Sequence, residues 1–298
     1  MLPPRAGAVA RVLFGRSNPK DGTARPIPIF GAMRFSALLQ GNSGFRQMHD
    51  LELQERAALL FAPERMDMRF RFFEAMALPS LVAQDRDDWT FLIFYAETLP
   101  EPYRERLFDL VAPHDHITAI STEPHERLAM KLWRVMQRKA PREAERWVSF
   151  RLDDDDALAS GFISALRAAI DGIGPGLSAI TFPRGHVLGV DPAAGTFHLD
   201  ENVKKFGIGC GLAVHSPRDL RRGAYNLGAV HRHVDNAMPT LSDARELMYI
   251  IGAHVHSDTG ADSSRVTGTM KTPGLSAAEV VERLGPAFAH VDLPRLLR

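Results

Sequence analysis

The chain has 298 residues, of which 45% are hydrophobic and 24% charged, a composition typical of a globular protein with a sizeable core. Lys and Arg together number 36, as do Asp and Glu, which argues against nucleic acid as a partner. No apolar run approaches the roughly 18–20 residues that span a bilayer. Cys210 is the only cysteine, so no intramolecular disulfide can form, and we expect a cytoplasmic protein.

Residues 1–25 are expected to form a loosely ordered, basic leader, because prolines recur in them and Arg11 interrupts the apolar pieces. Arg5, Arg11 and Arg16 would allow a peripheral contact with an anionic membrane surface.

Strand and helix patterns alternate from Ile27 to about Ala169. Continuous apolar runs are typical of parallel strands buried on both faces, and their spacing favours βαβ crossovers. Pro79 should kink or restart the helix in which it lies. The expected strands are 27–34, 91–95, 116–121 and 147–152, and the expected helices are 68–84, 103–111, 128–136 and 158–169. These patterns predict a Rossmann-like α/β fold whose mainly parallel sheet is flanked by helices.

After Gly176 the pattern changes to short strands joined by turns, which predicts a smaller antiparallel C-terminal extension. Ser216 followed by Pro217 has the form of a helix N-cap and first helical position. Ser276 is expected to cap a C-terminal helix. The chain is therefore divided into a half at 26–175 and a half at 176–298.

Four consecutive carboxylates, Asp153 to Asp156, follow the apolar strand Val148–Leu152. Each adjacent pair repels at a cost of about 1 kcal/mol in water, and more where water is excluded. A bound cation would offset this repulsion, and oxygen ligands on a short turn suit Mg²⁺ or Mn²⁺. The alternative is a solvated acidic loop. The preceding strand favours a ligand site, since ligands of α/β sheets gather at the carboxyl ends of strands.

The Asp run resembles the Asp-x-Asp signature of GT-A glycosyltransferases. A wider set of motifs, over roughly residues 27–170, resembles the putative rhamnosyltransferase family of bacteria. Tyr249 to His256 is similar to a degenerate form of the late His-containing segment of that family, without the Asn and Gly expected near the His. The motifs are Arg69-Phe-Arg-Phe-Phe-Glu74, Leu78-Pro-Ser-Leu81, Gln84, Phe91 to Phe94, Leu99-Pro100 and Arg151 to Asp156.

The resemblance implies a GT-A-like fold, a nucleoside-diphosphate-sugar donor, an Mn²⁺ or Mg²⁺ cofactor and a glycan or other hydroxyl acceptor. The half at 26–175 would bind the nucleotide-sugar, and the half at 176–298 would face the acceptor. With a deoxythymidine diphosphate β-L-rhamnose donor, transfer would invert the anomeric centre and require a general base.

Candidate residues follow from the resemblance and from residue chemistry. Asp219 and Asp235 are candidates for the general base, although each also suits a surface or capping position. Arginine forks suit phosphate, but salt bridges to Glu74 or Glu97 would equally occupy them. The candidate donor-binding residues are Arg34, Arg69, Arg71, Glu97, Arg151, Asp153 and Asp154, and the candidate metal ligands are Asp155, Asp156, His254 and His256.

Three alternatives remain open. The pairs His231/His233 and His254/His256 could instead form a zinc site, or could be half-buried polar residues. A phosphohydrolase would place its acidic loop after the first strand and a hydroxyl residue where Ala157 stands. A non-catalytic protein of the same fold would bind nucleotide-sugar or metal without turnover.

Overall fold

The computed structural model describes residues 26–39, 51–206, 210–254, 272 and 274–298. The expected leader at 1–25, with Arg5, Arg11 and Arg16, lies outside the described residues, as does His256. No helix in the described part of the chain is long and apolar enough to cross a membrane.

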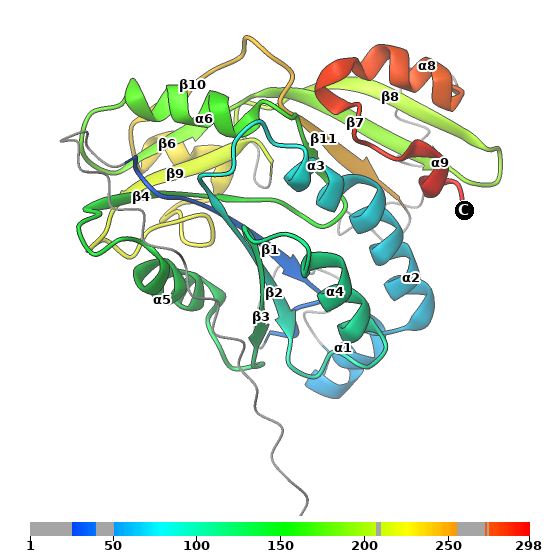
Figure 1. Cartoon of the computed structure of the whole chain (residues 1–298), viewed down its shortest axis with the longest axis horizontal. Coiled ribbons are helices and arrows are strands. Elements are labelled where there is room, and N and C mark those ends of the chain that lie inside the picture. The colour runs from blue at the N-terminus through cyan, green and yellow to red at the C-terminus, as the bar shows by residue number, and fades with distance from the viewer. Residues whose placement is uncertain (1–25, 40–50, 207–209, 255–271, 273) are drawn as a thin grey trace, which may run out of the picture.

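A seven-stranded sheet in the order β10-β6-β9-β4-β1-β2-β3 forms the centre of the fold (Figure 1). The four strands from the first half are parallel neighbours, while β9 runs antiparallel to both β4 and β6. The predicted mainly parallel α/β sheet is therefore confirmed, with β2 and β4 in its interior. The strands are β1 (Ile29–Phe35), β2 (Thr90–Ala96), β3 (Ile117–Thr122), β4 (Arg146–Arg151), β6 (Ser178–Thr181), β9 (Leu212–Pro217) and β10 (Thr240–Ser242).

Both faces of this sheet are covered, which explains why its strands read as continuous apolar runs. Phe91 and Ile93 of β2 face one core cluster, and Leu92 and Phe94 face a second. Helix α5 (Leu128–Lys139) covers the second cluster, on the opposite side of β1–β3 from the helices that cover the first (Figure 1). The first cluster is covered by α2 (Pro63–Phe72), η2 (Phe73–Ala77), α3 (Leu78–Val82), α4 (Tyr103–Val111) and α6 (Phe162–Asp171).

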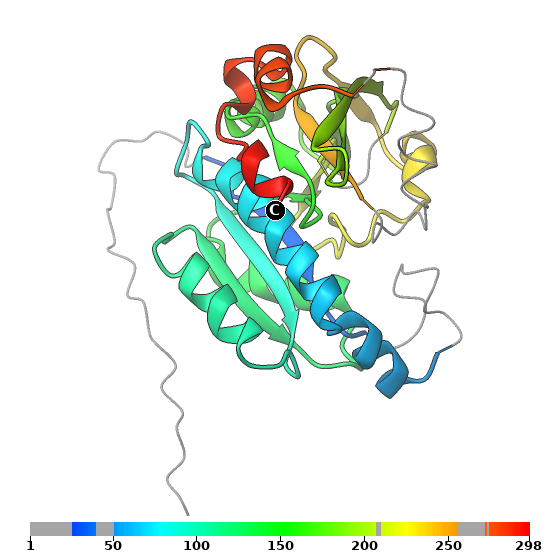
Figure 2. The same cartoon turned by 90° about the vertical axis from the view of Figure 1, so that its right-hand side faces the viewer.

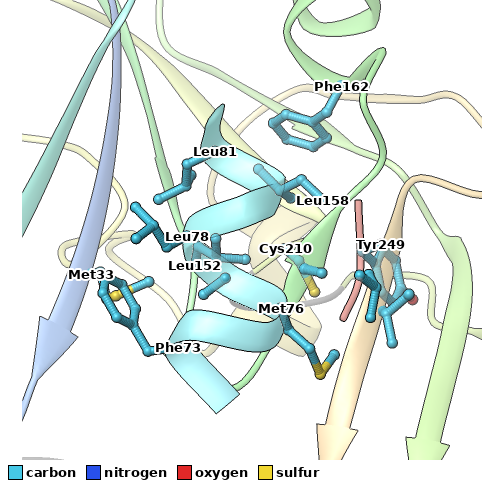
Figure 3. Packing of buried hydrophobic residues seen from close by; sticks show 14 of the residues in the cluster. Met33, Phe73, Met76, Leu78, Leu81, Leu152, Leu158, Phe162, Cys210 and Tyr249 are labelled. Carbon is cyan, nitrogen blue, oxygen red and sulfur yellow. The ribbon is translucent and has the colours of Figure 1, made fainter. Parts of the chain in front are cut away.

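Pro79 does not break its helix, which continues from α2 to α3 through the π-helical turn η2. Proline has no N–H to give to the carbonyl four residues earlier, which is that of Ala75. The Ala75 carbonyl instead accepts from the backbone N–H of Asp292 at 2.9 Å. The C-terminal segment with α9 (Leu293–Leu296) thus packs on this helix (Figure 2). Buried side chains of η2 and α3 pack against side chains of the sheet strands in the first core cluster (Figure 3).

A second, four-stranded sheet has the order β5-β11-β7-β8. The expected antiparallel extension is confirmed for the hairpin of β7 and β8, but β11 joins β7 in parallel. The region after Gly176 also supplies β6, β9 and β10 to the main sheet. The bounds are β5 (Ala157–Leu158), β7 (Arg184–Asp191), β8 (Thr196–Val203) and β11 (Tyr249–Ala253).

The helix expected to start at Ser216 is wrong, because Ser216 and Pro217 end strand β9. Trp147 and Arg146 of β4 pair with them, and these ladder bonds outweigh a local capping signal. Asp219 therefore lies in an exposed turn and not in the first turn of a helix. The cap at Ser276 is confirmed for α8 (Ala277–Leu284), where it forms a capping box with Glu279. The remaining helices are α1 (Leu53–Leu60), η3 (His231–Asn236) and η4 (Pro286–Phe288).

Candidate functional site

The candidate site lies at the edge of the main sheet where the parallel strands β1, β2 and β4 end. Arg34 stands near the end of β1, Glu97 follows β2, and the Asp run follows β4. Ligands of open α/β sheets bind at this edge.

The Asp run connects the two sheets, because β4 leads into it and β5 leaves it. Strand β5 is antiparallel to β11, with Ala157 paired to Ile250. Continuing this register brings Asp155 opposite Gly252. A Cβ atom at Gly252 would lie 2.1 Å from the Asp155 carbonyl oxygen, so the approach requires glycine.

Asp155 meets His254, the residue that follows β11. The Nε2 atom of His254 lies 3.1 Å from Oδ2 of Asp155, and the side chains are 10% and 22% exposed. The imidazole packs on the ring of Phe72, with centroids 4.3 Å apart. The structure thus brings a carboxylate and an imidazole together at the sheet edge, with part of the carboxylate open to solvent.

Two arginines engage the first two carboxylates. Arg151 holds Asp153 through two hydrogen bonds, from Nε at 3.1 Å and Nη2 at 2.7 Å, and Arg69 of α2 pairs with Asp154. Burial would raise the pKa of Asp153, but Arg151 and Arg34 outweigh it and hold that pKa below the ordinary value. Burial raises the pKa of Asp154 to about 6, with Asp155 and Asp153 adding to it against the opposing Arg69.

Asp156 points into the protein. Its Oδ1 accepts from the Gly252 N–H at 3.1 Å, and its Oδ2 lies 3.7 Å from Sγ of Cys210. Burial, followed by the charges of Asp155 and Asp153, raises its pKa well above the ordinary value. Cys210 lies within the packed interior near Tyr249 (Figure 3). This geometry makes Asp156 an anchor between the Asp run and β11.

Tyr225 also belongs to the site, although no sequence pattern singled it out. Its ring centroid lies 5.9 Å from Cζ of Arg151. Its hydroxyl oxygen is buried and has no hydrogen-bond partner among the described residues. The neighbouring Ala224 N–H donates to Ser149 Oγ of β4 at 3.0 Å, which positions the loop. No motif or periodicity in a loop of this kind could have indicated the tyrosine.

The donor set suits a divalent cation only in part. Among the described residues, no group of three or more His, Cys, Asp or Glu side chains is arranged to hold a metal ion. Asp155 and His254 supply one oxygen and one nitrogen, and both atom types are ligands of Mn²⁺. A cation here would therefore depend on oxygen atoms from the donor.

The other candidates lie apart from this group. Arg71 is half-buried on α2 and Glu97 is exposed, and no contact described here joins either to the Asp run. Asp235 is exposed and pairs with Lys205 at 2.9 Å, and His231 and His233 lie with it in η3. Among the described residues, Arg106 and Arg295 engage the carboxylate of Glu74, which was an alternative partner for the candidate arginines.

A family model described as "Putative rhamnosyl transferase" matches residues 28–266. No curated protein matches the chain. Among solved structures, S. aureus TarS 1-349 in complex with UDP-GlcNAc is 9% identical, with a TM-score of 0.44, over 79% of this chain and 61% of that one. The chain thus spans about three-fifths of TarS 1-349.

A putative nucleotide-diphospho-sugar transferase from Desulfovibrio desulfuricans G20 is 12% identical, with a TM-score of 0.40, over 92% of this chain and 98% of that one. Both likenesses are too distant to assign a substrate.

Proposed function

The chain belongs to the putative rhamnosyl transferase family, and from that premise we propose that it transfers a sugar, with rhamnose the first candidate, from a nucleoside diphosphate to a hydroxyl acceptor. The observation that supports this most directly is the meeting of Asp155 and His254 at the carboxyl edge of the sheet. A donor diphosphate would lie at this edge, where carboxylate, imidazole and guanidinium groups converge.

Asp155 and His254 are the proposed protein ligands of an Mg²⁺ or Mn²⁺ ion. Such an ion would neutralise the charge that develops on the leaving diphosphate. His254 must be neutral to bind it, and the packing of its ring against Phe72 holds the ring beside Asp155.

The arginines are proposed to receive the phosphates. Arg151 uses Nε and Nη2 for Asp153, and Arg69 uses Nη1 for Asp154. Among the described residues, Nη1 of Arg151 and Nη2 of Arg69 have no hydrogen-bond partner. The carboxylates therefore orient each guanidinium group without occupying all of its donors. The buried Tyr225 hydroxyl, beside Arg151, is proposed to donate a further hydrogen bond to the donor.

The test is a thermal-melting series with Mn²⁺ and a panel of nucleoside diphosphates. A ligand at about 100 times its dissociation constant adds roughly 2.7 kcal/mol to the free energy of unfolding. We expect one nucleotide to raise Tm only with Mn²⁺, and Asp155→Asn or His254→Ala to remove the shift. Asp67→Asn, an exposed carboxylate on α2, is the matched control. Unchanged metal-dependent affinity in Asp155→Asn and His254→Ala would contradict this site.

Turnover is tested separately, because a protein that only binds nucleotide-sugar would show the same shift. Hydrolysis or transfer of the matching nucleotide-sugar identifies an enzyme, and inversion is read from the anomeric product. Asp219→Asn and Asp235→Asn then test the two base candidates: loss of transfer with retained donor affinity would identify the base.

A further inference from the structure

Helix α5 carries a row of cations along one side. Arg127, Lys131, Arg134 and Arg138 follow at intervals of four, three and four residues, which places them on one helical face. We call these four residues the basic stripe. Residues 127–142 contain six Lys or Arg and no Asp or Glu, in a chain whose totals of cations and anions are equal.

The basic stripe faces away from the protein. Leu128, Leu132, Val135 and Met136 form the buried side of α5 against the second core cluster. Arg127, Arg134 and Arg138 are exposed. Among the described residues, no other helix supplies side chains to that cluster, and α5 lies on the outer side of β1–β3 (Figure 1).

The stability of α5 does not account for the stripe. Like charges three or four residues apart repel on a helix, and a cation at the N-terminus opposes the helix dipole. Arg127 occupies the N-cap, and the first turn contains no acidic residue. Lys131 pairs with Glu126, but within the described part of the chain Arg127, Arg134 and Arg138 form no ion pair. The charge is therefore available to a partner outside the fold.

We propose that the basic stripe binds the surface of an anionic lipid bilayer. The stripe is straight, carries one sign of charge and is about 16 Å long at 1.5 Å per residue, which suits a flat anionic surface. Met130, which is half-exposed, lies beside the stripe, whereas Trp133 packs against the second core cluster and is not part of this face.

Nucleic acid fits these residues less well. Binding to single strands uses aromatic faces on which bases stack. The Trp133 ring is covered by the guanidinium group of Arg221, whose Cζ lies 4.9 Å from the ring centroid. The bilayer proposal concerns a face formed by α5 and does not depend on the transfer reaction.

The test is sedimentation of the full chain with phosphatidylcholine vesicles, with and without about one-third phosphatidylglycerol. We expect anionic vesicles to bind at least about tenfold more protein, and about 0.5 M salt to abolish the difference. R134Q/R138Q should lose about tenfold in binding. R283Q/R298Q removes two exposed charges elsewhere and should bind as the wild type does.

Equal Tm values for the two double variants show that each is folded. Binding that R134Q/R138Q leaves unchanged, or equal binding to neutral vesicles, would overturn the proposal. Tighter binding to single-stranded RNA than to vesicles at the same salt, lost in R134Q/R138Q, would overturn it in favour of nucleic acid.

Discussion

His254 Nε2 lies 3.1 Å from Asp155 Oδ2 although the two residues stand 99 positions apart in the sequence. The contact follows from the register of β5 against β11, which places Asp155 opposite Gly252 and lets the chain reach His254 two residues later. A backbone register therefore brings the two proposed ligands together.

Gly252→Ala is expected to separate these residues. The new Cβ would lie 2.1 Å from the Asp155 carbonyl oxygen. Because this oxygen belongs to the backbone, the clash cannot be relieved by rotating a side chain. We expect a loss of about 1–3 kcal/mol in the free energy of unfolding, measured by urea denaturation, together with weaker metal-dependent nucleotide binding. Gly174→Ala is the control, because nothing lies within 4 Å of the position that its Cβ atom would take. Equal behaviour of the two variants would refute the role given to Gly252.

Asp154 is expected to make stability depend on pH. Its pKa of about 6 exceeds the ordinary value of 3.8, so the folded state holds this proton more tightly than the unfolded state does. Stability from this group is therefore present below about pH 4 and is lost as pH rises through about 6. The Asn side chain of Asp154→Asn cannot titrate. As pH rises from 4 to 7, the free energy of unfolding of this variant should therefore increase relative to the wild type by up to about 3 kcal/mol.

Urea denaturation of both proteins across this range measures the gain. The interaction of ionised Asp154 with Arg69 already contributes to this pKa, so it is part of the pH-dependent difference. A difference that stays constant from pH 4 to 7 would show that Asp154 does not have this raised pKa.

The Arg151–Asp153 pair is expected to stabilise the end of β4. Its side chains are 20% and 32% exposed, so Arg151→Met should cost about 1–2 kcal/mol, less than a fully buried pair. A double-mutant cycle with Asp153→Asn isolates the coupling by urea denaturation. Arg245 and Asp243 also lie two residues apart and form two hydrogen bonds, but Arg245 is 80% exposed, so their cycle should give a smaller coupling energy. Equal coupling energies would mean that burial of the Arg151 pair adds nothing.

Tyr225→Phe is expected to separate binding from stability. The hydroxyl is buried without a described partner, so removing it should leave the free energy of unfolding equal or slightly higher. Nucleotide affinity should fall about tenfold if the hydroxyl donates to the ligand, as calorimetry would show. Lower stability with unchanged affinity would make Tyr225 a structural residue alone.

The sheet was predictable because its strands are buried on both faces and its helices have clear apolar stripes. The run Phe91 to Tyr95 and the stripe of Leu128, Leu132, Val135 and Met136 both occur where they were expected. Ser216 shows the limit of local signals, because pairing of β9 with two strands outweighed a good helix cap. Pairing partners of this kind cannot be read from one segment.

The candidate site was predictable only through residues with strong chemical character. The Asp run and the late histidine could be singled out, and the structure places Asp155 beside His254. The partner of Asp154 could not be assigned, because Arg69 lies 85 residues away on α2. Tyr225 gave no signal, because its position depends on the hydrogen bond that ties its loop to Ser149.

The bond from the Asp292 N–H to the Ala75 carbonyl has a consequence for the order of folding. During synthesis, Asp292 is added 217 residues after Ala75 (292 − 75 = 217), and Arg295, which binds Glu74, follows it. Contacts between segments so distant in the chain form late, because loop closure must come first. The helix that carries Arg69 therefore acquires its last partners only after most of the chain has left the ribosome, and a nascent chain that stops short of Asp292 would lack them.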